Sequence, residues 1–278
     1  RISLSNNDAG ADNTVFGFLA GAALQVNGDD NTIIGDYSGT AITTGDKNVI
    51  IGAEAGKTMT TANESTIIGY GAGIAISAGQ TVTDGTVAVG AFALGALTSG
   101  IGNVAVGYLS LDANQTSDYN TAVGHQSLSG VNGDGAQGNT AVGYQAGVAI
   151  TDGTQNTIVG TQALMTDDRS DKTTAIGYQA LKSQDGGTGN SGNTGVGYAA
   201  GYENADGTNN TWLGYAAGLG GAGTSNSDNV GVGSSALLAI TTGGSNVAIG
   251  ASAGYVTTTE SDNVFIGKDS ASLMYGSS

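Results

Sequence analysis

The apolar positions of this chain follow a five-residue phrase that recurs fifteen times. In its commonest form the phrase runs Asn, Thr or Val, an apolar residue, a bulky apolar residue, and Gly. The closing glycine returns after 17 residues in nine of the fourteen intervals and after 18 to 21 residues in the others. A unit that accepts short insertions predicts stacked coils with one constant part and one surface loop. The glycines are Gly17, Gly35, Gly52, Gly69, Gly90, Gly107, Gly124, Gly143, Gly160, Gly177, Gly197, Gly214, Gly233, Gly250 and Gly267.

Alternation along the phrase assigns its residues to the two faces of a short strand. The residue before the glycine is always large and apolar, and the residue three before it is always Thr or Val. We expect this pair to point inward, together with the Ala or Ser that stands three residues after every glycine. An apolar residue often stands seven after the glycine, such as Ile42 or Ile150, and would close the far wall. The sequence therefore predicts an all-β fold, a parallel β-solenoid of about fifteen coils of 17–21 residues, with 1–278 as one repetitive domain.

The middle residue of the phrase, two before the glycine, would then face outward. None of the fifteen residues at this position is polar. A continuous apolar stripe is larger than a soluble monomer normally exposes, so we expect copies of the same chain to cover it. The residues expected in this oligomer interface are Ile33, Ile50, Ile67, Ile158, Trp212 and Phe265.

Asparagine opens the phrase in twelve of the fifteen units. Stacked in register, these side chains would form an amide ladder at one corner of the coil. The closing glycines would provide a bend where a side chain would collide or φ must be positive. Both positions are expected to serve architecture rather than chemistry.

The phrases at 139–143 (NTAVG) and 246–250 (NVAIG), each followed three residues later by Ala, resemble the head repeat of trimeric autotransporter adhesins. They are also similar to repeats of bacteriophage tail fibres and bacterial surface fibres, and the resemblance covers essentially the whole chain. It implies a left-handed parallel β-roll, three intertwined or adjacent chains, and display on a cell or a virion. The coils here are longer than the usual adhesin repeat, and we see neither a heptad stalk nor an outer-membrane anchor.

Composition narrows the range of partners. Seven basic and 23 acidic residues give a net charge of −16, which disfavours nucleic acid and anionic membranes. With no cysteine and one histidine, the chain has no disulfide, Cys-ligated zinc site, thiol nucleophile or His-rich metal site. No apolar run approaches the length of a membrane span, so we expect no membrane insertion by this segment. The chain begins at Arg1, so we expect a processed product or part of a longer fibre protein.

No catalytic constellation is apparent, so the chain is not expected to be an enzyme. His125 follows a repeat glycine, where several sister units carry tyrosine, and is expected to join a partial tyrosine ladder. The Asp-rich turns at 29–30, 151–153, 167–171 and 206–207 fit ordinary turn chemistry, with calcium as an alternative ligand and no other cofactor expected. The tyrosine ladder and the longer loops at 74–85 and 182–192 are candidate glycan-binding surfaces.

These features favour an extracellular structural or adhesive fibre protein, a homotrimeric segment of a cell-surface or virion fibre that contacts its own copies and a surface receptor or glycan. The alternative is a subunit of a self-assembling extracellular filament, which would need open ends and heterologous contacts. An ice-binding solenoid would need Thr on a flat outer face, whereas Thr is expected here to point inward. A polysaccharide lyase would need basic and acidic residues gathered on one wall, and the seven basic residues are scattered.

Overall fold

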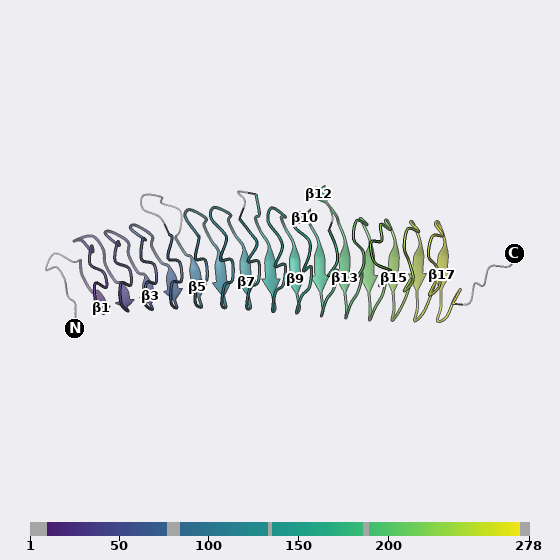
Figure 1. Ribbon diagram of the computed structural model, residues 1–278, viewed down its shortest axis with the longest axis horizontal. Helices are drawn as coiled ribbons and strands as arrows, with labels where there is room; N and C mark the ends of the chain where they lie inside the picture. The colour runs from purple at the N-terminus through teal and green to yellow at the C-terminus, as the bar shows by residue number, and fades with distance from the viewer. Residues whose placement is uncertain (1–9, 77–83, 133–134, 186–188, 273–278) are drawn as a thin grey trace. The chain divides into compact units, whose positions relative to one another are not determined.

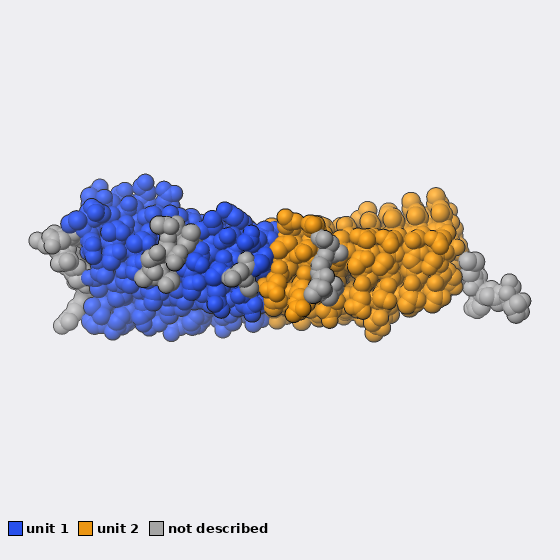
Figure 2. All heavy atoms as spheres, turned by 90° about the horizontal axis from the view of Figure 1, so that it is seen from above, with its two compact units in different colours: residues 1–138 blue, residues 139–278 orange. Residues whose placement is uncertain are grey.

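The computed structural model describes residues 10–76, 84–132, 135–185 and 189–272. The described residues form strands, turns and bends and contain no helix, so the predicted all-β class is confirmed. The chain divides into two compact units, Arg1–Gly138 and Asn139–Ser278, which Figure 2 shows in different colours. The same coil repeats within each unit.

Each phrase folds as a three-residue strand, and the strands of each unit lie side by side in chain order (Figure 1). The first unit contains β1 (Thr14–Phe16), β2 (Thr32–Ile34), β3 (Val49–Ile51), β4 (Thr66–Ile68), β5 (Val87–Val89), β6 (Val104–Val106) and β7 (Thr121–Val123). The second contains β8 (Thr140–Val142), β9 (Thr157–Val159), β11 (Thr174–Ile176), β13 (Thr194–Val196), β14 (Thr211–Leu213), β15 (Val230–Val232), β16 (Val247–Ile249) and β17 (Val264–Ile266). The short strands β10 (Ser170–Asp171) and β12 (Gly189–Asn190) pair separately, away from the main sheet.

The strands are parallel, and each phrase position pairs with the same position of the next phrase. Val142 lies opposite Val159, and Val159 lies opposite Ile176. These three residues therefore share one column, as predicted. The parallel β-solenoid predicted from the repeat is confirmed.

The orientation of the two strand faces is opposite to the prediction. In every main strand after β1 the middle residue is buried, and Ile50, Ile158 and Trp212 have no exposed surface. The residues on either side point outward, so that Val159 is 36% exposed and Ile249 42%. A three-residue strand places its middle side chain on one face and its two end side chains on the other. The coil is narrow and admits one side chain from each strand, which is the middle one.

The rest of the interior follows the prediction. The small residue three after the glycine is buried, as Ala55, Ala146 and Ala253 show. The apolar residue seven after the glycine is buried as well, as at Ile42 and Ile150. Each coil therefore contributes a strand residue, a small corner residue and a far-wall residue to its core.

The predicted asparagine ladder is confirmed, and Asn156 shows its geometry. Its backbone N–H and its side-chain Nδ2 both donate to Asn139 Oδ1, at 3.0 Å each. Nδ2 also donates to Ser170 O at 2.7 Å, and Oδ1 accepts the backbone N–H of Thr173 at 2.9 Å. Each such bond contributes about 1 kcal/mol net, and a buried group left without its partner costs about 1–3 kcal/mol. The ladder thus ties successive coils together wherever neighbouring phrases open with Asn.

The closing glycine is required by the close approach of the coils. At Gly160 the backbone has φ of +137°, in the region that favours glycine. A Cβ there would lie 2.3 Å from the carbonyl oxygen of Gly177 in the next coil. The predicted bend is therefore present. The glycine is needed both because φ is positive and because a side chain would collide with the next coil.

Candidate functional site

The outer face of the main sheet carries two columns of side chains in each unit. One column is the bulky apolar residue before the glycine, and the other is the Thr or Val three before it, nine Thr and six Val in all. None of these positions is charged, although the chain has 30 charged residues, seven basic and 23 acidic. An uncharged, largely apolar sheet surface of this kind is typical of a contact surface.

The interface residues predicted from the sequence do not lie on this face. Ile33, Ile50, Ile67, Ile158 and Trp212 are fully buried inside the coil, and Phe265 is 7% exposed. They cannot contact another chain while the coil is folded, so their assignment to an oligomer interface is wrong. The exposed apolar column consists instead of the residues that follow them in sequence.

One local feature of the sequence, glycine at the middle position of the phrases on either side of Trp212, agrees with the observed orientation. Trp212 lies between Gly195 and Gly231 in the same column of the sheet. A Cβ on Gly231 would lie 2.8 Å from the indole ring, and a Cβ on Gly218 would lie 2.2 Å from it. Glycines in the neighbouring coils make room for the large indole ring. Such compensation of side-chain volume is required only in an enclosed column.

The predicted tyrosine ladder is present at the corner that follows the sheet. The rings of Tyr178 and Tyr198 stack at 5.3 Å with an angle of 12° between them, and those of Tyr198 and Tyr215 stack at 5.1 Å and 9°. His125 joins the ladder as expected, with its ring 5.1 Å from that of Tyr108. These aromatic side chains remain substantially exposed, with Tyr215 at 60%.

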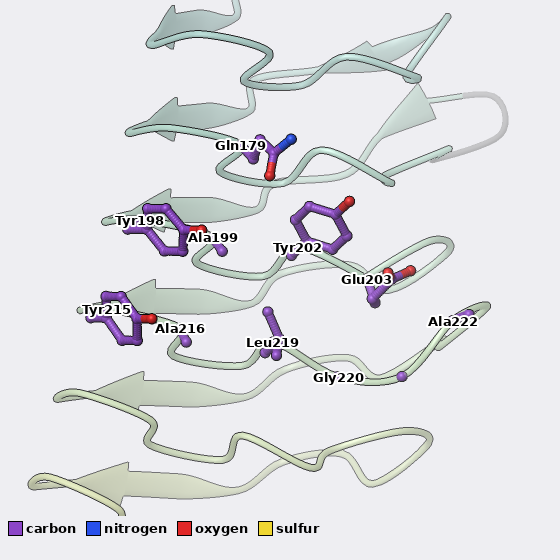
Figure 3. Close-up of a pocket in the computed structure, with 11 residues that line it drawn as sticks. Gln179, Tyr198, Ala199, Tyr202, Glu203, Tyr215, Ala216, Leu219, Gly220 and Ala222 are labelled. Carbon is purple, nitrogen blue, oxygen red and sulfur yellow. The ribbon is translucent and has the colours of Figure 1, made fainter.

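A groove lies beside this stack in the second unit. Tyr198 and Tyr215 form one wall, and Tyr202, Glu203 and Leu219 lie on the opposite side of a floor made by two alanines (Figure 3). The hollow has a volume of about 430 Å³. Its residues are Gln179, Tyr198, Ala199, Tyr202, Glu203, Tyr215, Ala216, Leu219, Gly220, Gly221 and Ala222, which we call the tyrosine groove.

Two of the turn aspartates cap backbone groups of the preceding coil. Asp29 Oδ1 accepts the N–H of Ala11 at 2.6 Å, and Asp171 Oδ1 accepts that of Thr154 at 2.6 Å. Within the described ranges, no three His, Cys, Asp or Glu side chains gather as metal ligands would. The turn chemistry predicted for Asp29 and Asp171 therefore has direct support, and the alternative of a calcium site stays a prediction.

Asp167 differs from the other turn aspartates because it is fully buried. Its Oδ1 accepts the N–H groups of Arg169 and Ser170, at 3.1 and 2.9 Å, and its Oδ2 accepts Gln184 Nε2 at 2.9 Å. Gln184 in turn accepts Asn193 Nδ2 at 3.0 Å. This network replaces apolar packing in the far wall of these coils.

The structure describes only parts of the two candidate loops. Residues 77–83 of the loop at 74–85 and 186–188 of the loop at 182–192 lie outside the described residues. The glycan-binding prediction for these loops therefore stays a prediction.

Comparison of the chain with protein-family models, with curated proteins and with solved structures found no match in any of the three. The part of the chain that the structure describes contains no helix long and apolar enough to span a membrane. The function of this chain therefore has to be inferred from the surfaces of the solenoid itself.

Proposed function

We propose that this chain is a segment of an extracellular structural or adhesive fibre, at a cell or virion surface, and that it assembles with copies of itself through the outer face of its sheet. A homotrimer is the assembly that the resemblance to adhesin and tail-fibre repeats implies. A self-assembling filament of the same subunits is the alternative. Neither assembly requires catalytic residues.

The observation that carries the proposal is the uncharged outer face of the strands. In the second unit, Val142, Val159 and Ile176 form an exposed column that is bounded by a column of Thr. Burying apolar surface stabilises association by about 25 cal/mol per Å² before the ordering costs are subtracted. Because the same column recurs from coil to coil, a copy of the chain with the same spacing would match it along the stack.

Two neighbouring residues with opposite orientations provide the test. Val159→Lys inserts a charge into the outer face, and we expect it to convert a trimer into a monomer with unchanged strand content. Ile158→Lys buries a charge inside the coil, and we expect it to reduce the stability of the fold itself by several kcal/mol. The measurements are the solution mass by sedimentation and the circular dichroism spectrum, with Val159→Thr as the conservative control that keeps the assembly.

Other outcomes would redirect the proposal. A wild-type chain that stays monomeric at high concentration, or a Val159→Lys variant that still assembles, would contradict assembly through this face. Long particles in negative stain would favour the filament. The expectation that Thr points inward, which counted against ice binding, is wrong, because the Thr column faces outward. A monomer that depresses the freezing point would therefore assign this face to ice binding instead.

A further inference from the structure

The tyrosine groove lies where the residue at one corner position changes from Gln to Ala along the second unit. The residue two after each phrase glycine is Gln145, Gln162 and Gln179 in three successive coils, and then Ala199 and Ala216. The glutamines form a short ladder, in which Gln179 Nε2 donates to Gln162 Oε1 at 2.9 Å. The alanines keep the same backbone, with φ of 50° and 51° against 55° at Gln179. Alanine in place of glutamine therefore shortens the side chain at this position without changing the backbone, and the missing atoms leave a hollow.

The walls of the hollow combine aromatic rings with polar tips. The phenolic oxygens of Tyr198 and Tyr215 lie on the side of the alanine floor, and Gln179 closes one end with its amide (Figure 3). On the far side, Lys182 Nζ lies 5.4 Å from the centre of the Tyr202 ring and donates a hydrogen bond of 3.3 Å to the Tyr202 hydroxyl. This contact holds the ring in place. The carboxylate of Glu203 adds acceptors to the same wall.

We propose that the tyrosine groove binds a short segment of a neutral oligosaccharide. Sugars present apolar ring faces and rows of hydroxyl groups, and this groove offers aromatic and alanine surface bordered by phenol, amide and carboxylate groups. Its volume of about 430 Å³ falls within the range of about 300–1,000 Å³ that ligand sites occupy. The stacked tyrosines are held by the solenoid, so little side-chain freedom is lost on binding.

The negative charge of the groove and of the chain favours neutral glycans over anionic ones. Among the described residues that line the groove, Glu203 is the only charged one; Lys182 lies beside Tyr202, and the whole chain carries −16. Sialylated or sulfated sugars would therefore be repelled. A wholly apolar ligand would leave the hydroxyl and carboxylate groups of the border without partners.

The proposal is independent of self-assembly, because the groove lies on the corner after the sheet and uses none of the outer-face columns. The test fills the hollow with the side chain that sister coils already carry, as the double variant Ala199→Gln/Ala216→Gln. The matched control is Ser252→Gln, which has the same corner position and φ of 56° but stands two coils beyond the groove. The thermal midpoint and solution mass of each variant are measured alongside binding, so that loss of binding is separated from loss of folding or assembly.

The probes are hexasaccharides of glucose, galactose, mannose and N-acetylglucosamine, with a sulfated heparin hexasaccharide as the anionic comparison, followed by saturation-transfer NMR and calorimetry. We expect at least one neutral probe to bind and to receive saturation from the tyrosine ring protons. The filled variant should weaken this binding about tenfold or more, and Ser252→Gln should leave it unchanged. The proposal is overturned if no neutral probe binds at millimolar concentration, if the heparin fragment binds as well as the neutral probes, or if filling the groove leaves affinity intact.

Discussion

At the scale of single residues, Asp167 stands where most other coils place an apolar side chain, such as Ile150 or Ile240. Burial raises the pKa of its carboxyl group, and the hydrogen bonds from Ser170, Arg169 and Gln184 offset part of that rise. The protonated form is therefore favoured in the folded chain more than in the unfolded one. One carboxyl group thus makes the stability of its coils depend on pH.

The sign of this dependence is testable with Asp167→Asn. A carboxyl group whose folded pKa is raised contributes stability below its unfolded pKa of about 3.9, and this contribution is lost as the pH rises through the folded pKa. We expect the unfolding free energy of the wild type, relative to that of Asp167→Asn, to fall across this window. Chemical denaturation at a series of pH values measures the difference, with Asp168→Asn, whose side chain is 40% exposed, as the control. A constant difference between wild type and Asp167→Asn would contradict the assignment.

At the scale of strands, β14 contains the largest side chain of the interior, and its neighbours β13 and β15 make room for it. Gly195 and Gly231 lie opposite Trp212 in the two adjacent strands. Gly231 does not have a positive φ, and the equivalent residue of β16 is Ala248. Glycine is therefore needed at this position because of the indole ring and not because of the backbone.

The pair Gly231→Ala and Trp212→Ile tests this compensation. In the wild-type background the new methyl would meet the indole at 2.8 Å, so we expect a loss of about 1–3 kcal/mol in unfolding free energy from overpacking. In the Trp212→Ile background the same change should be neutral or stabilising, since Ile158 already occupies this column beside Ala141 and Ala175. Equal losses in both backgrounds, measured in a double-mutant cycle by denaturant titration, would show that the two residues act independently.

At the scale of the whole molecule, an apolar face coexists with a net charge of −16. If copies associate through the sheet as proposed, they must overcome mutual electrostatic repulsion, which salt screens. Between about 0.01 M and about 0.1 M salt the Debye length falls from about 30 Å to about 10 Å, so association should strengthen over this range. Sedimentation equilibrium at both salt concentrations measures the effect. Weaker association at the higher concentration would mean that ion pairs, rather than the outer-face columns, hold the copies together.

The sequence by itself determined the repeat, the parallel register, the asparagine ladder and the glycine bend. These features depend on local chemistry that recurs at a fixed spacing: an amide that bonds to the next coil, or a backbone too close for a Cβ. The tyrosine stack was also predictable, because residues at one repeat position fall into one column. Tertiary structure was needed only to give its distances and angles.

Which strand face encloses the core was decided by the tertiary structure. Alternation separates the residues of a strand into two sets but does not say which set points inward, and here neither set contains a charged residue. The choice depended on the width of the coil, which admits one side chain per strand and compensates Trp212 with glycines from neighbouring coils. The tyrosine groove likewise required the fold, because Ala199 and Ala216 form a hollow only when the surrounding coils hold Gln179, Tyr202 and the stacked rings around them.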